Sequence, residues 1–132
     1  MFDTVSSSEE GSWLHLNVPG TEEKAYADSD KQKKPLRIKL KGPDSNAWTA
    51  FQRKAMKSQG KEKSHEDTIL EDSKLFAKMT LAFENIPSES GQALELTQEN
   101  AIKLYMNYKD IRIQALRFVM LQENFTQKQP EA

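Results

Sequence analysis

The chain has 132 residues and a formal net charge of −1, and 36% of its residues are apolar and 30% charged. This length predicts one domain with a modest core. The absence of cysteine excludes disulfides, thiolate metal sites and a cysteine nucleophile. No apolar run approaches the about 20 residues that cross a bilayer, and the acidic start MFDTVSSSEEG lacks the basic region of a secretory signal. We therefore expect neither a membrane-spanning segment nor a secretory signal.

Two segments near the N-terminus have the pattern of strands. Residues 1–11 are polar and rich in Ser and Glu, and we predict that they are disordered. In residues 12–18 (SWLHLNV) and again in 36–41 (LRIKLK), apolar and polar side chains alternate with a period of two. Two strands with one apolar face each predict an antiparallel pair, and helices must cover it because an isolated hairpin is marginally stable.

The next two predicted elements are helices over residues 45–60 and 65–86. Asp44 or Ser45 can cap the first, and Ser64, with Asp67 three residues later, can cap the second. Apolar residues recur every three or four positions in both. The stripes comprise Ala47, Trp48, Phe51, Ala55 and Met56 in the first helix, and Ile69, Leu75, Phe76, Met79, Ala82, Phe83 and Ile86 in the second.

The last predicted element is a helical region over residues 97–125, which Thr97 can cap. Its stripe comprises Ala101, Leu104, Tyr108, Ile111, Ala115, Phe118 and Phe125. The predicted fold is therefore α+β and predominantly α-helical, with an N-terminal two-stranded antiparallel β-hairpin packed on three to four helices. It forms a single domain over residues 12–125, and a disordered tail follows over 126–132.

Charge is strongly segregated along the chain. Residues 31–63 hold eleven Lys or Arg against two acidic residues, a formal charge of +9, while the segments before and after it carry −6 and −4. Such segregation is typical of a nucleic-acid surface, a site for an acidic partner, or head-to-tail pairing between copies. The candidate patch for self-association or an acidic partner comprises Lys39, Lys41, Arg53, Lys54, Lys57 and Lys61.

No constellation of residues indicates catalysis, a metal or a cofactor. His15 and His65 are the only histidines; His65 stands beside Glu66 and Asp67, yet a surface histidine in a polar first turn is the favoured interpretation. The carboxylates are scattered, and the five glycines form no phosphate-binding loop. We therefore expect a protein that is not an enzyme.

Two kinds of binding surface fit the pattern. The final helices carry much apolar and aromatic side chain for a small chain; most of it is core by default, but an exposed remnant would mark a partner site. The candidates for that site are Leu104, Tyr105, Tyr108, Ile111 and Phe118. Alternatively, the basic segment 31–63 could track phosphates while Trp48 or Phe51 stacks on bases. A sequence pI near 6.1 makes nucleic acid the second choice.

Four segments resemble, in this order over residues 12–125, the tail assembly chaperones of long-tailed double-stranded DNA phages: GSWLHLNVPGTEE, IKLKGPDSNAWTAFQRKAM, LAFENIP and LTQENAIKLYMNYKDIRIQALRFV. Phe83 stands where that family usually has Trp before Glu-Asn. Lys109-Asp110 stands where it usually has a proline after the second Tyr. Proline would break the helix, whereas here a break is only permitted, with Asp110 as a candidate cap, so a continuous helix through Lys109 stays open.

The resemblance implies a non-catalytic chaperone of the host bacterial cytoplasm that is absent from the mature virion. Such proteins bind the tape-measure protein, a very long helical chain, and keep it soluble while tail-tube subunits polymerise around it. The residue patterns agree with this role, because an apolar groove with a polar rim can engage helices at i, i+3, i+4 and i+7 anchors. Charge segregation also suits open-ended self-association.

The resemblance further implies a longer form, produced by ribosomal slippage near the end of the gene, whose extra domain would reach the tail-tube protein. Glu123-Asn124-Phe125 can be encoded GAA AAT TTY, which contains the slippery heptamer A AAT TTY. A GAG codon for Glu123 or an AAC codon for Asn124 would exclude slippage at this site.

Overall fold

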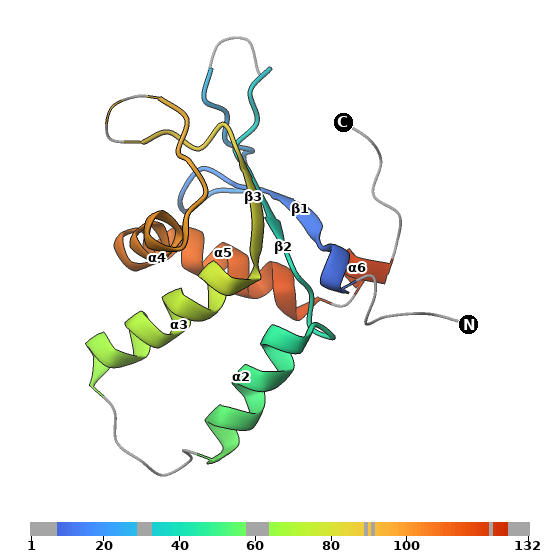
Figure 1. Cartoon of the computed structure of the whole chain (residues 1–132). Coiled ribbons are helices and arrows are strands. Elements are labelled where there is room, and N and C mark those ends of the chain that lie inside the picture. The colour runs from blue at the N-terminus through green and yellow to red at the C-terminus, as the bar shows by residue number, and fades with distance from the viewer. Residues whose placement is uncertain are drawn as a thin grey trace.

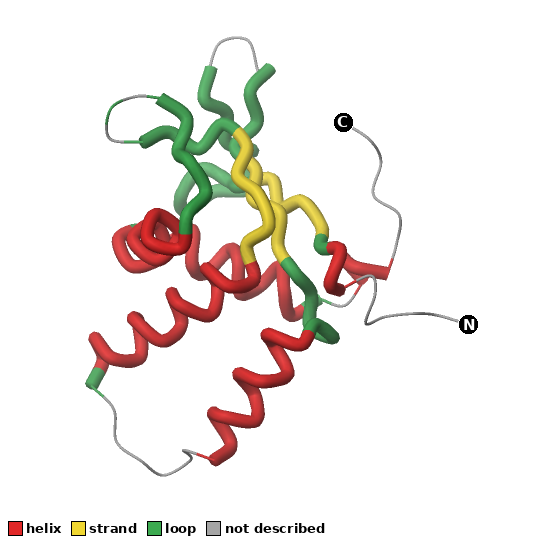
Figure 2. The backbone as a smooth tube through the Cα atoms, viewed as in Figure 1, coloured by secondary structure: helices red, strands yellow, loops and turns green. Residues whose placement is uncertain are grey.

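The computed structural model describes residues 8–28, 33–57, 64–88, 90, 92–121 and 123–126. Within these residues the protein is mixed α+β, with one antiparallel sheet packed against helices (Figure 1, Figure 2). The helices gather in the lower half of the view and the long loops lie in the upper half. The elements are β1 (Ser12–His15), β2 (Arg37–Leu40), α2 (Asn46–Lys57), α3 (His65–Met79), β3 (Thr80–Glu84), α4 (Gln98–Asn107), α5 (Lys109–Met120) and α6 (Glu123–Thr126).

The predicted pairing of the two N-terminal strands is confirmed. β1 and β2 run antiparallel with Leu14 opposite Ile38, and the side chains of Ile38 and Leu40 are fully buried. Both regular strands are shorter than predicted, because beyond β1 the pairing continues only through isolated bonds such as that from the Leu16 N–H to the Leu36 carbonyl (2.8 Å). The alternation of apolar residues thus identified both the partner strand and the buried face.

The prediction of one helix over residues 65–86 is wrong beyond Met79. The chain passes there from α3 directly into β3, which pairs antiparallel with β2, so the predicted two-stranded hairpin is a three-stranded sheet in the order β1-β2-β3 (Figure 1). This pairing satisfies backbone groups of β2 that would otherwise lie at an open edge. The apolar residues of this segment keep the spacing of a helix through the strand, because Phe83 pairs opposite Ile38 and Ile86 is buried just beyond the strand.

The final helical region is interrupted at Tyr108, which excludes a continuous helix through Lys109. Asp110 is not the cap of α5: Tyr108 occupies that position without a side-chain bond, and Asp110 lies in the first turn. Arg112 stabilises the break, because its guanidinium donates to the Tyr105 carbonyl (2.7 Å) near the end of α4, where carbonyls lack helical partners.

Apart from Asp110, the predicted helix caps are confirmed at Ser45, Ser64 and Thr97. The Ser64 hydroxyl accepts a hydrogen bond from the Asp67 N–H (3.1 Å) at the start of α3, and the Thr97 hydroxyl accepts one from the Asn100 N–H (3.0 Å) at the start of α4. At the start of α2, the Ser45 hydroxyl accepts from the Trp48 N–H (3.4 Å). The predicted end of that helix near residue 60 lies outside the described residues.

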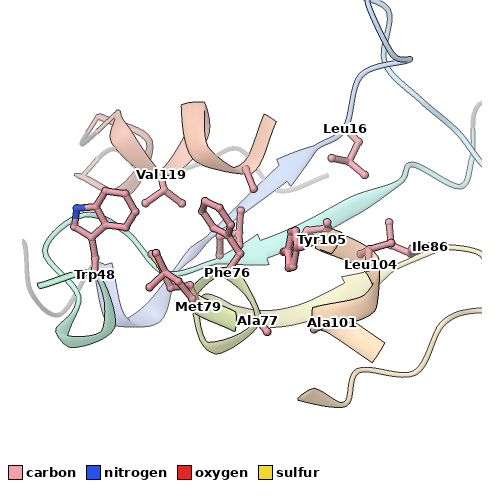
Figure 3. Close-up of a cluster of buried hydrophobic side chains, with 14 residues drawn as sticks. Leu16, Trp48, Phe76, Ala77, Met79, Ile86, Ala101, Leu104, Tyr105 and Val119 are labelled. Atoms are coloured by element: carbon pink, nitrogen blue, oxygen red, sulfur yellow. The ribbon is translucent and has the colours of Figure 1, made fainter. Parts of the chain in front are cut away.

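The core lies between the sheet and α3, α4 and α5. Figure 3 shows it running from Trp48 and Val119 at one end to Leu104 and Ile86 at the other. Small buried residues, Ser73 and Ala77 on α3 and Ala101 on α4, let these two helices pack closely. The largest fully buried side chain is Tyr105, whose hydroxyl shares a 2.7 Å hydrogen bond with the Thr80 hydroxyl.

The N-terminal residues from Ser8 onward pack against the C-terminal helix, which differs from the predicted disorder of residues 1–11. Ser8 is buried; its carbonyl accepts from the Gly42 N–H (2.9 Å) and its hydroxyl from the Asp44 N–H (3.1 Å). The Phe125 ring of α6 is buried against Gly42, where an added Cβ would lie 2.6 Å from the ring carbon Cγ. Residues 1–7 and 127–132 lie outside the described part of the chain.

Candidate binding groove

Helix α2 is anchored mainly at the end nearest the sheet. Trp48, in its first turn, is buried in the core and lies 5.9 Å from the Phe51 ring between ring centroids. Further along the same stripe Ala55 is exposed and Met56 is 76% exposed. The stripe predicted from Ala47 to Met56 therefore exists, but the protein covers only its beginning.

A groove of about 570 Å³ lies between α2 and α3. Its apolar lining includes Phe51 and the alanines of α2 on one side and Leu75 of α3 on the other. Phe51 is only half-buried, so its ring remains available to an occupant. The complete lining comprises Ala47, Ala50, Phe51, Lys54, Ala55, Thr68, Glu71, Asp72, Lys74, Leu75 and Lys78.

Charged side chains line the same groove. Lys54 comes from α2, while Glu71, Asp72, Lys74 and Lys78 come from α3. α2 and α3 are the two lower arms in Figure 1. The start of α2 and the end of α3 lie nearest the sheet, and we call this end of the groove the sheet end. The end of α2 and the start of α3, which residues 58–63 connect along the chain, form the linker end. A groove lined by apolar side chains and by charged side chains of both signs is suited to a helix that has one apolar face and polar flanks.

The five residues predicted for partner binding do not share one surface. Leu104 and Tyr105 are buried in the core, and Tyr105 contacts Phe76 of α3 and Thr80 of β3. Tyr108 is 57% exposed, because the break between α4 and α5 turns it outward. Ile111 and Phe118 are partly buried and pack against the core, with the Phe118 ring in an edge-on contact with Phe125.

A second hollow, of about 600 Å³, includes two of those five residues. Leu104 and Tyr108 line it together with Asn100, Lys103 and Asn107 of α4. The remaining lining residues precede α4 and are Pro87, Ser88, Ser90, Gln92, Ala93, Leu94 and Glu95. Most of its side chains are polar or small, and the larger apolar residues, Leu94 and Leu104, are half-buried and buried. It therefore offers less accessible apolar surface than the groove between α2 and α3.

The predicted basic patch is divided among separate surfaces. Lys39 lies on the sheet beside the Trp13 ring (5.9 Å to the centroid), and Lys41 pairs with Glu9 (3.7 Å). Arg53 and Lys54 are exposed on α2, and Lys54 lines the groove. The Lys57 side chain and Lys61 lie outside the described atoms.

The two histidines have different surroundings. The His15 ring shares a 2.9 Å hydrogen bond with the Ala25 carbonyl and packs edge-on against Tyr26, whereas His65 is exposed in the first turn of α3. No group of three or more His, Asp or Glu side chains within the described ranges could hold a metal ion. Among the helices that the structure describes, none combines the length and the apolar character needed to span a bilayer.

One buried group has a perturbed ionisation. Burial raises the pKa of the Tyr105 hydroxyl far above its usual value, and the hydrogen bond with Thr80 offsets only part of that rise. A neutral, hydrogen-bonded phenol in the core stabilises the packing of α4 on the junction between α3 and β3. Its full burial makes its role structural.

The groove as a whole was not predicted as a site: Leu75 and Lys78 belonged to no predicted site, Lys54 was predicted for the basic patch, and Phe51 was named only as a base-stacking residue of the nucleic-acid alternative. One indication of the groove in the sequence was the length of the apolar stripe of α2, which runs on through Ala55 and Met56 although the strands and the final helices offer little to cover it.

Comparison with protein-family models, with curated proteins and with solved structures finds no match for this chain.

Proposed function

We propose that this protein is a non-catalytic tail assembly chaperone, and that the groove between α2 and α3 holds amphipathic helices of a phage tape-measure protein. The observation that carries the proposal is the half-buried Phe51, which lines the groove together with the alanines of α2, with Leu75 of α3 and with charged side chains from both helices. The identity of the client as a tape-measure protein rests on the sequence resemblance.

The shape and chemistry of the groove support a helical client. Helix-in-groove recognition places apolar anchors at i, i+3, i+4 and i+7 into an apolar channel, while polar residues of the client face the rim. The three alanines of α2, Ala47, Ala50 and Ala55, leave room for such anchors beside Phe51. A groove without convergent catalytic groups suffices for keeping an aggregation-prone helix soluble.

Nucleic-acid binding through residues 31–63 is the weaker proposal. Trp48 is buried and cannot stack on a base in this conformation. Arg37 is paired with Glu84, and Lys41 with Glu9, which reduces the positive charge of the sheet surface. Retention on DNA-cellulose that falls steeply with salt would favour this alternative.

The proposal includes weak self-association and a longer form. Exposed Arg53 and the acidic surfaces of a neighbouring copy would give salt-screened, open-ended contacts in the host cytoplasm. Slippage at the Asn124-Phe125 codons would occur after both residues have been decoded. The short and the long form of the protein would therefore both retain the buried Phe125 ring. An extension toward the tail-tube protein would then leave from the end of α6.

Co-expression tests the proposed function. A helical segment of a phage tape-measure protein is produced with the wild-type chain, with Phe51→Glu or with Met106→Glu, which alters an exposed apolar residue of α4 outside the groove. We expect wild type and Met106→Glu to keep the segment soluble and Phe51→Glu to lose this ability while retaining a cooperative thermal transition. Failure of the wild-type chain to solubilise any such segment would refute the proposal. Loss of solubility with Met106→Glu alone would move the site to α4.

A further inference from the structure

We infer that the outward face of α5 is a docking surface for an acidic amphipathic helix of another protein. This surface is separate from the groove between α2 and α3, so the inference goes beyond the proposed function. It rests on the apolar side chains that α5 presents on the side away from the core and on the cations beside them.

Helix α5 carries apolar side chains on two opposite faces. On the inner face Ala115 and Val119 are fully buried, and Phe118 packs against the core beside them. On the outer face Leu116 is 39% exposed and Met120 is 63% exposed. A helix that is apolar on all sides is normally buried on all sides. The described residues cover only the inner face of α5, so its outer face is suited to a partner.

The outer face has the form of a narrow stripe. Ile113, Leu116 and Met120 follow one another at steps of three and four, so they lie within about 60° of one another around the helix axis. Ile113 is half-buried, and the other two are exposed. This is the a/d spacing of the seam along which one helix packs on another. The stripe is narrower than the apolar face of a helix that lies in a membrane interface.

Cations stand around the stripe. Arg112 lies on one side of it, Arg117 on the other, and Lys109 at its N-terminal end; Arg117 and Lys109 are exposed and Arg112 is half-buried. Among the described residues none of the three has an ion-pair partner. Arg112 donates to the Tyr105 carbonyl, a neutral acceptor, which leaves its positive charge uncompensated.

The single carboxylate of α5 is turned toward the segment that follows β1. Asp110 accepts a hydrogen bond from the Gln114 side chain, and the Gln114 amide also bonds the backbone N–H (2.7 Å) and carbonyl (3.1 Å) of Asn17. Three cations and this one carboxylate give the surroundings of the stripe a formal charge of +2. The surface is therefore apolar along its centre and positive at its margins.

Charge complementarity selects the occupant. When two helices pack along a seam, the residues beside one seam face those beside the other and set the choice of partner. Glutamates beside the seam of the occupant would face Arg112 and Arg117. Pairing with α5 of a second copy would instead set arginine against arginine, whether the two helices ran parallel or antiparallel.

The other helices of a second copy do not match this surface either. Among the helices that the structure describes, α5 alone exposes more than one large apolar side chain; α2 exposes Met56, α4 exposes Met106, and α3 exposes none. The occupant is therefore a helix of another protein, apolar along one stripe and acidic on both sides of it.

Two synthetic peptides of about 21 residues, long enough to form a helix, test this preference. Both carry leucine at every a and d position, and one carries glutamate and the other lysine at every e and g position, so that like charges prevent each peptide from pairing with itself. At low salt we expect the glutamate peptide to bind the full chain about three- to tenfold more tightly than the lysine peptide, and the ratio to approach one at high salt. Affinity is measured by fluorescence anisotropy.

A matched pair of variants locates the binding. Leu116→Gln/Met120→Gln removes the exposed apolar side chains without adding charge and should weaken binding of the glutamate peptide about tenfold or more. Met56→Gln/Met106→Gln removes two exposed methionines from α2 and α4 and should leave the affinity unchanged. Because all four side chains are exposed, both variants should melt within a few degrees of wild type.

Charge reversal tests the margins of the surface. Lys109→Glu/Arg117→Glu should invert the preference, so that the lysine peptide binds more tightly than the glutamate peptide. Lys74→Glu/Lys78→Glu reverses two exposed lysines of α3 that line the groove, and it should preserve the wild-type ratio.

Several results would overturn the inference. These are equal affinity of wild type for the two peptides, no binding of either peptide, and unchanged binding by Leu116→Gln/Met120→Gln. Binding to phosphatidylserine vesicles, or a dimer in sedimentation velocity, that this variant abolishes would also overturn it, because a membrane or a second copy would then occupy the face. Phe51→Glu separates the inference from the proposed function: it should keep the affinity for the glutamate peptide while it loses client solubility. Loss of peptide binding in Phe51→Glu alone would place the peptide in the groove and refute docking on α5.

Discussion

Tyr105 and Tyr108 lie three residues apart, and the same substitution should have opposite effects at the two positions. The Tyr105 ring is fully buried, lies 5.6 Å from the Phe76 ring between centroids, and shares a hydrogen bond with Thr80. Tyr108 marks the break after α4 and is mostly exposed. Truncation to alanine therefore leaves a cavity in the first case and removes surface contacts in the second.

The expected magnitudes follow from this burial. Replacing a buried aromatic ring by alanine costs about 3–5 kcal/mol, whereas an exposed substitution changes stability by about 0.5 kcal/mol or less. For a domain of this length, 1 kcal/mol corresponds to roughly 3–5 °C in melting temperature. Tyr105→Ala should thus lower the melting temperature by about 10–20 °C and Tyr108→Ala by about 2 °C at most. Tyr105→Phe keeps the ring and loses only the bond with Thr80, for about 1 kcal/mol.

Differential scanning calorimetry at neutral pH, with urea denaturation as a second measure, distinguishes these outcomes. The order of stability should be wild type close to Tyr108→Ala, then Tyr105→Phe, then Tyr105→Ala. If Tyr105→Ala melts like wild type but no longer solubilises the client, the Tyr105 ring belongs to a binding surface and the packing of α4 described above is incorrect. Equal losses at both positions would contradict the exposure of Tyr108.

Three further predictions test features of the fold. Above pH 10 the native state retains the Tyr105 proton, whereas the unfolded chain loses it. The free energy of unfolding should therefore fall as pH rises beyond about 10, by up to about 1.4 kcal/mol per pH unit. Urea titrations of Tyr105→Phe should show a shallower decline. Phe125→Ala should cost about 3 kcal/mol in thermal unfolding, since the ring is buried beside Gly42; an unchanged melting temperature would show that α6 does not support the domain. Ser64→Ala should cost about 1 kcal/mol and Ser64→Asp much less, because aspartate can accept the same bond from the Asp67 N–H; equal urea midpoints for wild type and Ser64→Ala would refute the cap.

Features set by neighbouring residues were predictable from the sequence. The alternation around Ile38 and Leu40 gave the strand pairing, and the hydroxyls of Ser64 and Thr97 marked helix starts because their bonds reach only three residues along the chain. The third strand was not predictable in this way. Phe76, Met79, Phe83 and Ile86 keep helical spacing although the backbone changes at Thr80, and only the unpaired edge of β2, distant in sequence, favours a strand there.

The candidate site was missed for a related reason. The stripes of α2 and α4 have the same periodicity, yet α4 is covered because Ser73 and Ala77 admit it closely against α3, while α2 meets the body chiefly through Trp48. Periodicity shows that a face is apolar but does not show which other element reaches it. For that reason Leu104 and Tyr105 were assigned to a surface, whereas Phe51 and Leu75 line the groove.

The one-sided support of α2 has a consequence for release. Its first turn is held by Trp48 and by the Glu9 carboxylate, which accepts from the Asn46 N–H (3.0 Å), but Ala55 and Met56 near its other end are exposed. A helical segment with few buried contacts opens at low free energy, so hydrogen exchange should be faster in its last turns than in α3. A client that orders this segment loses part of the binding free energy to conformational entropy. The complex should then be short-lived, and under the proposed function this would let a growing tail tube displace the protein without an external source of energy.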